Sequence, residues 1–478
     1  MDSAGKLRSK AARDPGSKSE GPSGGALPVS LFAGYGAVAA PFEMLRAPAI
    51  AIVPALYAKE FGFSLAAISL ALLTLRLTDG VTDIFVGVLS DKTRSPWGRR
   101  KPWLLASVFL AIPAAYGLYV PGENPNIWSF LLCYFIFYLA WTMFDIPYTA
   151  WSAELAHRYE DRSRLALWRG FGGNAGLIIL TMVPLLPFLP STEMNFVTLN
   201  ALFWVVAVTF TAGVLYAVFR LPSDATATKT ERFSFRETIS AIKANRPFQI
   251  FLGVALLSDM AGGFMGAMFF LFFDTYLKIG QHFTLMHLVA IGLSLVSLQL
   301  WKYFLQRTSK STVLVASMAG AALGGALIAL LEPGPNALVH FIIYLSLFFI
   351  MQIGREVALY SIFGDIIDYD KWKSAGVRAG IYSSAWMMLR KIALALSGAL
   401  AFLIAGVIGF DPSASSFSET AIFGLKATNG YIPAILFLAA MFLAAQFPLT
   451  KARHRIIQRK LEQRALRSGA VSVQPERS

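Results

Sequence analysis

The sequence has little charge and few of the residues that redox or metal chemistry needs. Only 15% of its 478 residues are Asp, Glu, Lys or Arg, whereas 56% are hydrophobic. This balance excludes an ordinary soluble domain. The single cysteine, Cys133, excludes an intrachain disulfide, and the five histidines show no metal-ligand spacing. We therefore expect a membrane protein without a metal or redox cofactor.

Long apolar runs make up most of the chain. A membrane-spanning helix needs about 20 mostly apolar residues, and runs of this length recur between short polar connectors. We predict an all-α membrane protein with twelve transmembrane helices. The predicted spans cover residues 28–58, 64–90, 103–121, 127–152, 165–188, 197–220, 248–277, 283–305, 311–331, 337–364, 380–409 and 430–449.

Positive charge is distributed unevenly over the connectors. The net charge of +14 could by itself indicate a nucleic-acid partner. However, the basic residues gather after even-numbered spans, whereas connectors after odd-numbered spans carry little beyond Lys59, Lys278 and Lys426. By the positive-inside rule this pattern places both termini in the cytoplasm. We therefore expect a multi-pass protein of the cytoplasmic (inner) membrane with no nucleic-acid partner.

The longest polar connector, residues 221–247, divides the membrane part into two six-helix halves. Such a plan fits a transporter whose substrate site lies between the halves near the bilayer midplane. The basic C-terminal tail could bind anionic lipid headgroups or a partner. The predicted organisation is a disordered tail (1–27), a first half (28–220), a linker (221–247), a second half (248–450) and a basic tail (451–478).

Charges inside apolar spans indicate a functional site, because each central charge costs at least about 2.5 kcal/mol to insert. The stretch LTDGVTDIFVGV places Asp79 and Asp83 on one helical face, about 6 Å apart. Two bare carboxylates would repel there, so we expect a Na⁺ ion or a proton between them, with Thr82 adding a hydroxyl. The alternative is a static salt bridge to another helix. Further charges in the spans, without an assigned role, are Glu43, Arg76, Asp259 and Arg355.

Lys391 is a candidate for the basic partner of this acid pair. It lies in MLRKIALALSGAL, within a late span of the second half. We hypothesise that Lys391 and the cation alternate as counter-charges, so that binding of one releases the other. Such an exchange would couple the two halves.

A second polar position occurs in TMFDIPYTAW, residues 142–151. Asp145 precedes Pro147, which loosens the helix and frees backbone carbonyls. A carboxylate beside aromatic rings suits a polyhydroxylated ligand, although ordinary packing explains the rings equally well. Arg169, in ALWRGFGGNAG, could pair with Asp145 or contact ligand oxygens. The aromatic residues around this acid are Trp141, Tyr148 and Trp151.

With these residues in place, the chain resembles the glycoside-pentoside-hexuronide:cation symporters of the major facilitator superfamily, whose type member is the melibiose permease. The resemblance rests on RLTDGVTDIFVGVLSDKTRSPWGRRKPW, on MFDIPYTAW with EDRSRLALWRG, and on FGDIIDYDKWKSAGVRAGIYSSAWMMLRK. It implies the twelve-helix major facilitator fold and symport of a sugar or glycoside with a monovalent cation by alternating access. It also implies a monomer in the lipid bilayer, with no enzymatic activity.

The resemblance also assigns residues to sites. Asp79 and Asp83 match the paired acids of the family's cation site, Thr142 matches a threonine of the same site, and Thr82 stands where the type member has asparagine. Because Na⁺ needs several oxygen ligands and a proton needs one carboxylate, the two hydroxyls favour Na⁺ over H⁺. Lys391 matches the family's lysine near these acids.

Substrate and gating positions follow from the same match. Asp145 and Arg169 match positions implicated in sugar recognition, and Trp141 falls at an aromatic position near the sugar. The basic stretch after the second span resembles the superfamily's loop motif, whose charges help to latch the outward-facing state. Its residues here are Asp91, Arg99 and Arg100.

Departures from the family pattern leave the substrate open. Ala40 and Pro41 stand where the type member has a lysine and a sugar-binding aspartate, and Thr149 replaces an expected tryptophan. The family pattern extends to a branch of lysophospholipid symporters, so an amphiphilic substrate is an alternative. The D-x-x-x-D spacing also occurs in intramembrane prenyltransferases, but the sequence has no second acid-rich motif of that kind. A nontransporting sensor with a transporter fold is a further alternative.

Overall fold

A computed structural model describes residues 27–156, 159–222, 235–374, 378–448 and 451–467. Nearly all of the expected N-terminal tail, much of the linker 221–247 and the end of the basic tail lie outside the described residues. Within them the protein is all-helical, as predicted. Eleven helical segments are long and apolar enough to span a membrane, and the bent first segment makes a twelfth.

The N-terminal half contains the first six spans. Its first span is broken into three short helices and bends by 45° before the third. Pro48 lies inside the second of these helices and Pro54 at the start of the third, where each removes a backbone donor. The Tyr134 hydroxyl donates to the Ala49 carbonyl at 2.6 Å, which satisfies an acceptor in the bent region. The helices are α1 (Val29–Ala37), α2 (Ala39–Ala51), α3 (Val53–Phe61), α4 (Leu65–Lys92), α5 (Lys101–Tyr119), α6 (Ile127–Leu155), α7 (Tyr159–Met182) and α8 (Phe196–Arg220).

The C-terminal half contains six further spans and two flanking helices. The last span begins at Glu419 rather than near residue 430, because Ser418 caps a helix whose polar turns continue through a π-helical segment, Ala427–Tyr431. The helices are α9 (Phe235–Ala244), α10 (Arg246–Phe270), α11 (Phe283–Arg307), α12 (Lys310–Ala329), α13 (Ala337–Ser374), α14 (Ala379–Val407), α15 (Glu419–Lys426), α16 (Ile432–Ala445) and α17 (Lys451–Arg467).

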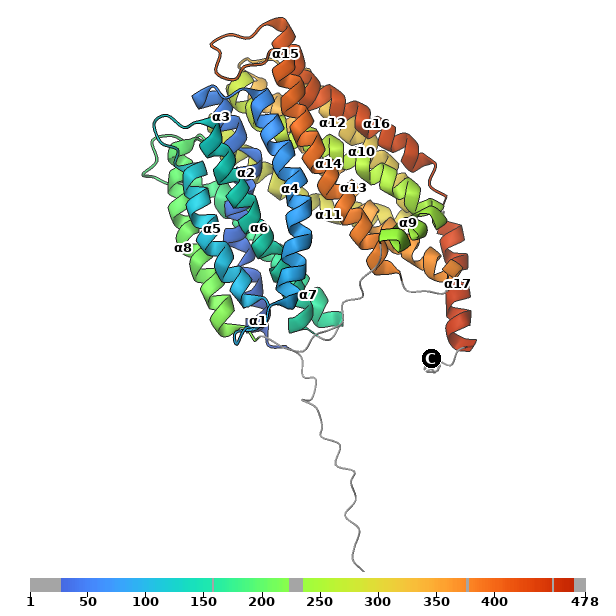
Figure 1. Cartoon of the computed structure of the whole chain (residues 1–478). Coiled ribbons are helices and arrows are strands. Elements are labelled where there is room, and N and C mark those ends of the chain that lie inside the picture. Colours follow the sequence, from blue (N-terminus) through green and yellow to red (C-terminus); the bar gives the residue numbers. More distant parts are fainter. Residues whose placement is uncertain (1–26, 157–158, 223–234, 375–377, 449–450, 468–478) are drawn as a thin grey trace, which may run out of the picture.

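The two halves lie side by side, with α4 of the first half packed against α14 of the second (Figure 1). We call the end of the molecule at which α1 begins and α17 lies the terminal end, and the opposite end the far end. The helices of the two halves approach each other at the far end and diverge toward the terminal end (Figure 1). The cavity that this arrangement encloses lies between α4 and α6 on one side and α10 and α14 on the other.

Polar contacts join the halves near the far end. The Lys59 ammonium lies 2.7 Å from the Asp274 carboxylate, and Asp274 is buried. By contrast, the ion pairs Arg99–Glu154 and Lys310–Asp365, at the terminal end, each lie within one half. The described conformation is therefore closed at the far end. Hydrogen bonds between the halves include Ser69 to Ala399 O (2.7 Å), Thr284 to Thr181 O (2.8 Å) and Thr192 to Gln281 O (3.0 Å).

Candidate cation and substrate site

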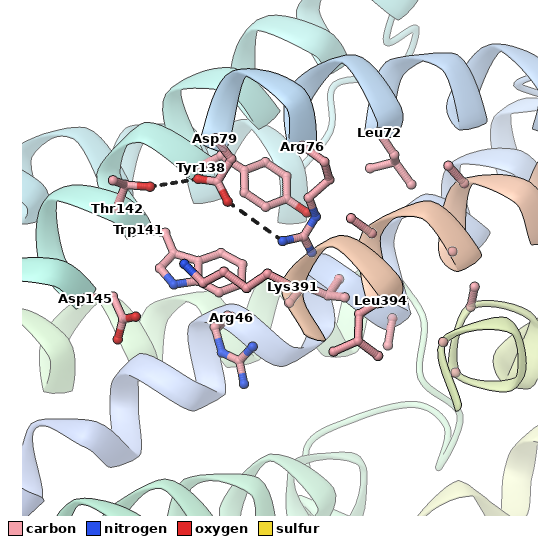
Figure 2. A pocket seen from close by; sticks show the side chains of 18 of the residues that line it. Arg46, Leu72, Arg76, Asp79, Tyr138, Trp141, Thr142, Asp145, Lys391 and Leu394 are labelled. Atoms are coloured by element: carbon pink, nitrogen blue, oxygen red, sulfur yellow. Dashed lines mark hydrogen bonds and ion pairs between the residues drawn. The ribbon is translucent and has the colours of Figure 1, made fainter. Parts of the chain in front are cut away.

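A cavity of about 400 Å³ lies between the halves, within the usual size range of small-molecule sites. Helices α2, α4 and α6 contribute most of its polar side chains. Helix α10 contributes Gly262, Gly263 and Gly266, so its backbone forms part of the wall. Figure 2 shows how the charged and aromatic residues from these helices converge. The charged lining residues are Arg46, Arg76, Asp79, Asp83, Asp145 and Lys391.

Thr142 of α6 connects the two acids of α4. Its hydroxyl oxygen lies 2.8 Å from an oxygen of Asp79 and 3.1 Å from an oxygen of Asp83. The spacing of four residues places both carboxylates on the face of α4 that α6 covers. A hydroxyl has one proton and can donate to only one carboxylate at a time. The three oxygen-bearing groups thus form a cluster that suits a shared cation or an additional proton.

Each of the two acids also lies near a basic side chain. Lys391 reaches from α14 of the other half and places its ammonium 2.8 Å from Asp83, while 61% of the lysine side chain is exposed. Arg76 lies 4.0 Å from Asp79 on the same helix. Lys391 is therefore the counter-charge of Asp83 in this conformation, and this ion pair joins the two halves.

Thr82, predicted as a cation ligand, does not line the cavity. Its hydroxyl donates to the backbone carbonyl of Asp79 at 3.1 Å, within its own helix. Each helical residue turns by about 100°, so the neighbour of Asp83 points away from the face that the acids share. The structure brings together Asp79, Asp83 and Thr142, but not Thr82.

The predicted substrate residues separate into two groups. Trp141 and Asp145 line the cavity. Tyr148 and Trp151 are buried outside it, at 0% and 1% exposure. The ring of Tyr148 stacks on Tyr35 at 4.3 Å. These two aromatic residues belong to the packing of the first half, so direct contact with a ligand in the cavity is not supported.

A hydrogen bond fixes the ring of Trp151 within the first half. Its indole nitrogen donates to the carbonyl of Pro222 at 3.2 Å, which ties α6 to the segment after α8. A buried indole N–H needs such a partner. Two of the three predicted aromatic residues around Asp145 therefore belong to the packed interior of the first half, and Trp141 alone of the three lines the cavity.

Arg169 of α7 lies next to Asp145, outside the cavity. Its guanidinium donates to that carboxylate and lies 4.9 Å over the ring of Tyr148. Close packing of α7 on α1 sets this position: a Cβ at Gly172 would lie 1.9 Å from the carbonyl oxygen of Gly36. Arg169 is not among the residues that line the cavity. It orients Asp145 instead of reaching into the space itself.

Two arginines flank Trp141 in the cavity (Figure 2). The guanidinium of Arg46 lies 5.0 Å, and that of Arg76 5.5 Å, from the ring centroid. Both distances fall within the range of cation–π attraction. Arg46 also donates to Glu43 at 2.9 Å. The sequence showed these charges inside spans, but spacing alone could not show that two of them face the cavity.

The predicted loop motif forms a compact charge cluster at the terminal end. Arg100 lies 2.6 Å from Asp91 and 2.9 Å from Glu154, at the end of α6. Arg99 reaches the same Glu154 oxygen at 3.0 Å. The loop after α4 is thereby attached to α6. Glu154 is a member of this cluster that the sequence did not indicate, because the motif lies 54 residues before it.

Four charges inside the second half pair with one another next to Lys391. Arg355 of α13 lies 2.8 Å from Asp259 of α10, and both side chains are buried. Glu356 accepts from Arg390 of α14 at 2.7 Å. This charge network connects α10, α13 and α14. It accounts for Asp259 and Arg355 as structural charges and holds the segment of α14 that carries Lys391.

Comparison with known proteins identifies the family. The family model described as MFS/sugar transport protein matches residues 34–451. The putative glycoside/cation symporter YagG of Escherichia coli is 24% identical and covers 87% of this chain and 91% of its own. The sodium-dependent lysophosphatidylcholine symporter 1-A of Danio rerio is 21% identical and covers 81% of this chain and 79% of its own.

A solved structure agrees with the fold. The crystal structure of the nucleoside transporter NupG gives a TM-score of 0.61 at 15% identity, covering 87% of this chain and 98% of that one. The family match confirms the predicted resemblance, and it supports a transporter rather than the prenyltransferase-like enzyme considered above. The chain is therefore a multi-pass membrane transporter that belongs to the MFS/sugar transport protein family.

Proposed function

We propose that the protein is a symporter that uses a cation gradient to move a sugar or glycoside across the cytoplasmic membrane. One observation carries this proposal: Asp79, Asp83 and Thr142 of one half meet Lys391 of the other half at the wall of a cavity. An acid pair inside a membrane protein is costly unless it serves ion movement or pairing. Here the counter-charge is Lys391 on α14 of the second half, and α14 must move relative to α4 when the two halves rearrange.

Coupling follows from competition at Asp83. A cation that binds between the acids neutralises them and releases Lys391, so the ion pair between α4 and α14 breaks when the site is loaded. The halves can then rearrange around the cavity. Symport requires that the fully loaded and the empty transporter reorient more readily than the singly occupied one. In the empty transporter Lys391 supplies the missing positive charge.

Sodium is the favoured coupling ion. Two carboxylates and the Thr142 hydroxyl provide several oxygen ligands within one cluster, whereas a proton needs one carboxylate only. The sodium dependence named for the Danio rerio relative supports the same choice. Proton coupling is the alternative, and it predicts uptake that follows the pH gradient instead.

The substrate site includes Asp145 and Trp141. A carboxylate accepts hydrogen bonds from sugar hydroxyls, and an indole ring covers the apolar face of a sugar. Both residues line the same cavity as the acid pair. Because the Arg169 guanidinium donates a hydrogen bond to the Asp145 carboxylate, this carboxylate is oriented before the ligand binds.

A lysophospholipid-like amphiphile is the second candidate substrate. Apart from Lys391, the wall contributed by α10 and α14 is apolar and includes Leu394, Phe402 and the glycines of α10. Such a wall suits an acyl chain at least as well as a sugar ring. The relative from Danio rerio carries lysophosphatidylcholine in its name.

We further propose that the terminal end faces the cytoplasm. Connectors at this end include the basic loop with Arg99 and Arg100, as the positive-inside rule requires. The described conformation, closed at the far end by Lys59 and Asp274, is then inward-facing. A monomer is the expected functional unit, because one chain supplies both halves of the cavity.

Uptake into proteoliposomes tests this function. The purified full chain would be offered radiolabelled glycosides, pentosides, uronides and lysophosphatidylcholine under a Na⁺ gradient, a pH gradient or neither. Sodium-stimulated uptake of a sugar that Asp79→Asn abolishes would support the proposal. Uptake of lysophosphatidylcholine alone would select the second candidate. Gradient-independent uptake of every compound, in wild type and variant alike, would refute cation coupling.

A further inference from the structure

A second cavity, of about 320 Å³, lies at the terminal end of the second half, apart from the transport site. It forms where α17 lies against the ends of α10 and α13. Figure 1 shows α17 in red beside the terminal end of this half. Its polar and aromatic lining consists of Arg246, Tyr369, Trp372, Arg453 and Lys460.

Helix α17 is attached firmly enough to form a wall of this cavity. Arg464 donates to the carbonyl of Trp372, the last aromatic residue of α13, at 2.6 Å. His454 lies 3.2 Å from both Asp365 and Asp368. Ile457 is 6% exposed. The cavity is therefore a packed feature of the second half rather than a gap beneath a loose tail.

The charge of the cavity is positive. Arg246 lies in the first turn of α10, and Arg453 and Lys460 lie on α17. The described residues that line the space include no acid. Helix α17 as a whole contains seven Lys or Arg residues and one Glu. An anion is the ligand that this surface attracts.

The remaining lining is apolar. Pro247, Pro448, Ile456 and Ile457 complete the wall, and the Lys460 ammonium lies 5.4 Å over the ring of Trp372. Ile456 is 55% exposed, so part of this apolar surface faces outward. A small soluble anion would satisfy the bases but leave these side chains uncovered. A ligand that has both an anionic group and a hydrocarbon chain matches both parts of the cavity.

The position of the cavity in the fold specifies which amphiphile it suits. It lies where α10 begins and α13 ends, and its lining includes Tyr369 and Trp372, residue types that are enriched at membrane surfaces. Basic pockets between helices at this level bind the headgroups of anionic lipids. A bilayer phospholipid carries an anionic group and acyl chains in one molecule, so it matches both parts of this lining.

We propose that this cavity binds an anionic phospholipid, with the phosphate among Arg246, Arg453 and Lys460 and the upper part of an acyl chain against the apolar wall. The bound lipid connects α17 with α10 and α13. This site is independent of the transported substrate, because none of its residues lines the central cavity.

Native mass spectrometry of the purified, delipidated full chain tests the proposal. We expect one tightly bound phosphatidylglycerol, in preference to phosphatidylcholine. Removing three bases near a membrane surface, in R246Q/R453Q/K460Q, should weaken that binding by about 100-fold. The matched control K371Q/R455Q/R459Q removes the same charge from exposed positions outside the cavity and should bind like wild type. Equal loss in the control, or no preference for phosphatidylglycerol, would overturn the proposal.

A second measurement needs no charge variant and so does not depend on whether the triple variant folds. Brominated phosphatidylglycerol should quench the fluorescence of Trp372 in wild-type protein. The contribution of Trp372 is the difference in quenching between wild type and the Trp372→Phe variant. Inorganic phosphate added in excess should leave this quenching unchanged if the lipid is the ligand. Absence of Trp372-dependent quenching, or its displacement by phosphate alone, would overturn the lipid assignment.

Discussion

Replacing Lys391 by glutamine should tighten cation binding while it abolishes net transport. In the structure the lysine ammonium occupies one side of Asp83 at 2.8 Å. If the cation must displace this ammonium from Asp83, replacing the lysine removes a competitor for the cation site. The expected effect on affinity is therefore opposite to that of most substitutions in a binding site.

The size of this effect follows from the geometry. A hydrogen bond between charged groups contributes about 1.5–3 kcal/mol when it is shielded from water. The lysine side chain is 61% exposed, which lowers its contribution toward the ~1 kcal/mol of a surface ion pair. A gain of that size corresponds to a Na⁺ affinity about five times tighter in Lys391→Gln.

Two assays separate affinity from transport. Isothermal titration of the purified protein with Na⁺ gives the affinity, and proteoliposomes report both net uptake and substrate exchange. Exchange needs only the loaded transporter and should persist, whereas net uptake needs the empty transporter to return and should be lost. Lys302→Gln, an exposed lysine on α11, is the matched control. Weaker Na⁺ binding in Lys391→Gln, or loss of exchange together with uptake, would refute the competition.

Other positions give further predictions. Thr142→Val should weaken Na⁺ binding about fivefold, because it removes one oxygen ligand worth ~1 kcal/mol; titration checks this, and an unchanged affinity would exclude the hydroxyl from the site. Asp259→Asn should destabilise the protein by about 1.5–3 kcal/mol, because the buried Arg355 loses one of its two carboxylate partners and keeps only Glu356; a melting temperature equal to wild type would contradict it. Gly172→Ala should abolish sugar uptake by forcing α7 away from α1, while Gly170→Ala, whose Cβ meets no atom within 4 Å, should not.

Local spacing predicted part of the site, and the fold was needed for the remainder. The four-residue separation of Asp79 and Asp83 determines their common face in any helix, so their pairing could be predicted from sequence. Thr142 and Lys391 come from other helices: Lys391 could be proposed as a partner from its charge inside a span, whereas only the family resemblance connected Thr142 with the acids. Spacing on one helix contains no information about which helix lies opposite.

The errors have similar physical causes. Tyr148 and Trp151 were predicted to contact substrate because aromatic residues near an acid are typical of sugar sites, but the same residues also fill a membrane-protein core. The last span was predicted to start too late, because polar residues between 419 and 429 lower the hydropathy of a helix that nevertheless forms. Hydropathy reports where a helix can contact lipid, not where it begins.

The ion pair between Asp83 and Lys391 also constrains how the protein is made. The two residues lie 308 positions apart, in the second and eleventh spans. A chain that enters the membrane from its N-terminus inserts the acid pair long before α14 is synthesised. During that interval Asp83 lacks its partner from the second half, and Arg76 is the basic residue of α4 next to the acid pair. Arrival of α14 then supplies the positive charge of Lys391, so the ion pair that we propose to break during transport can form only late in assembly.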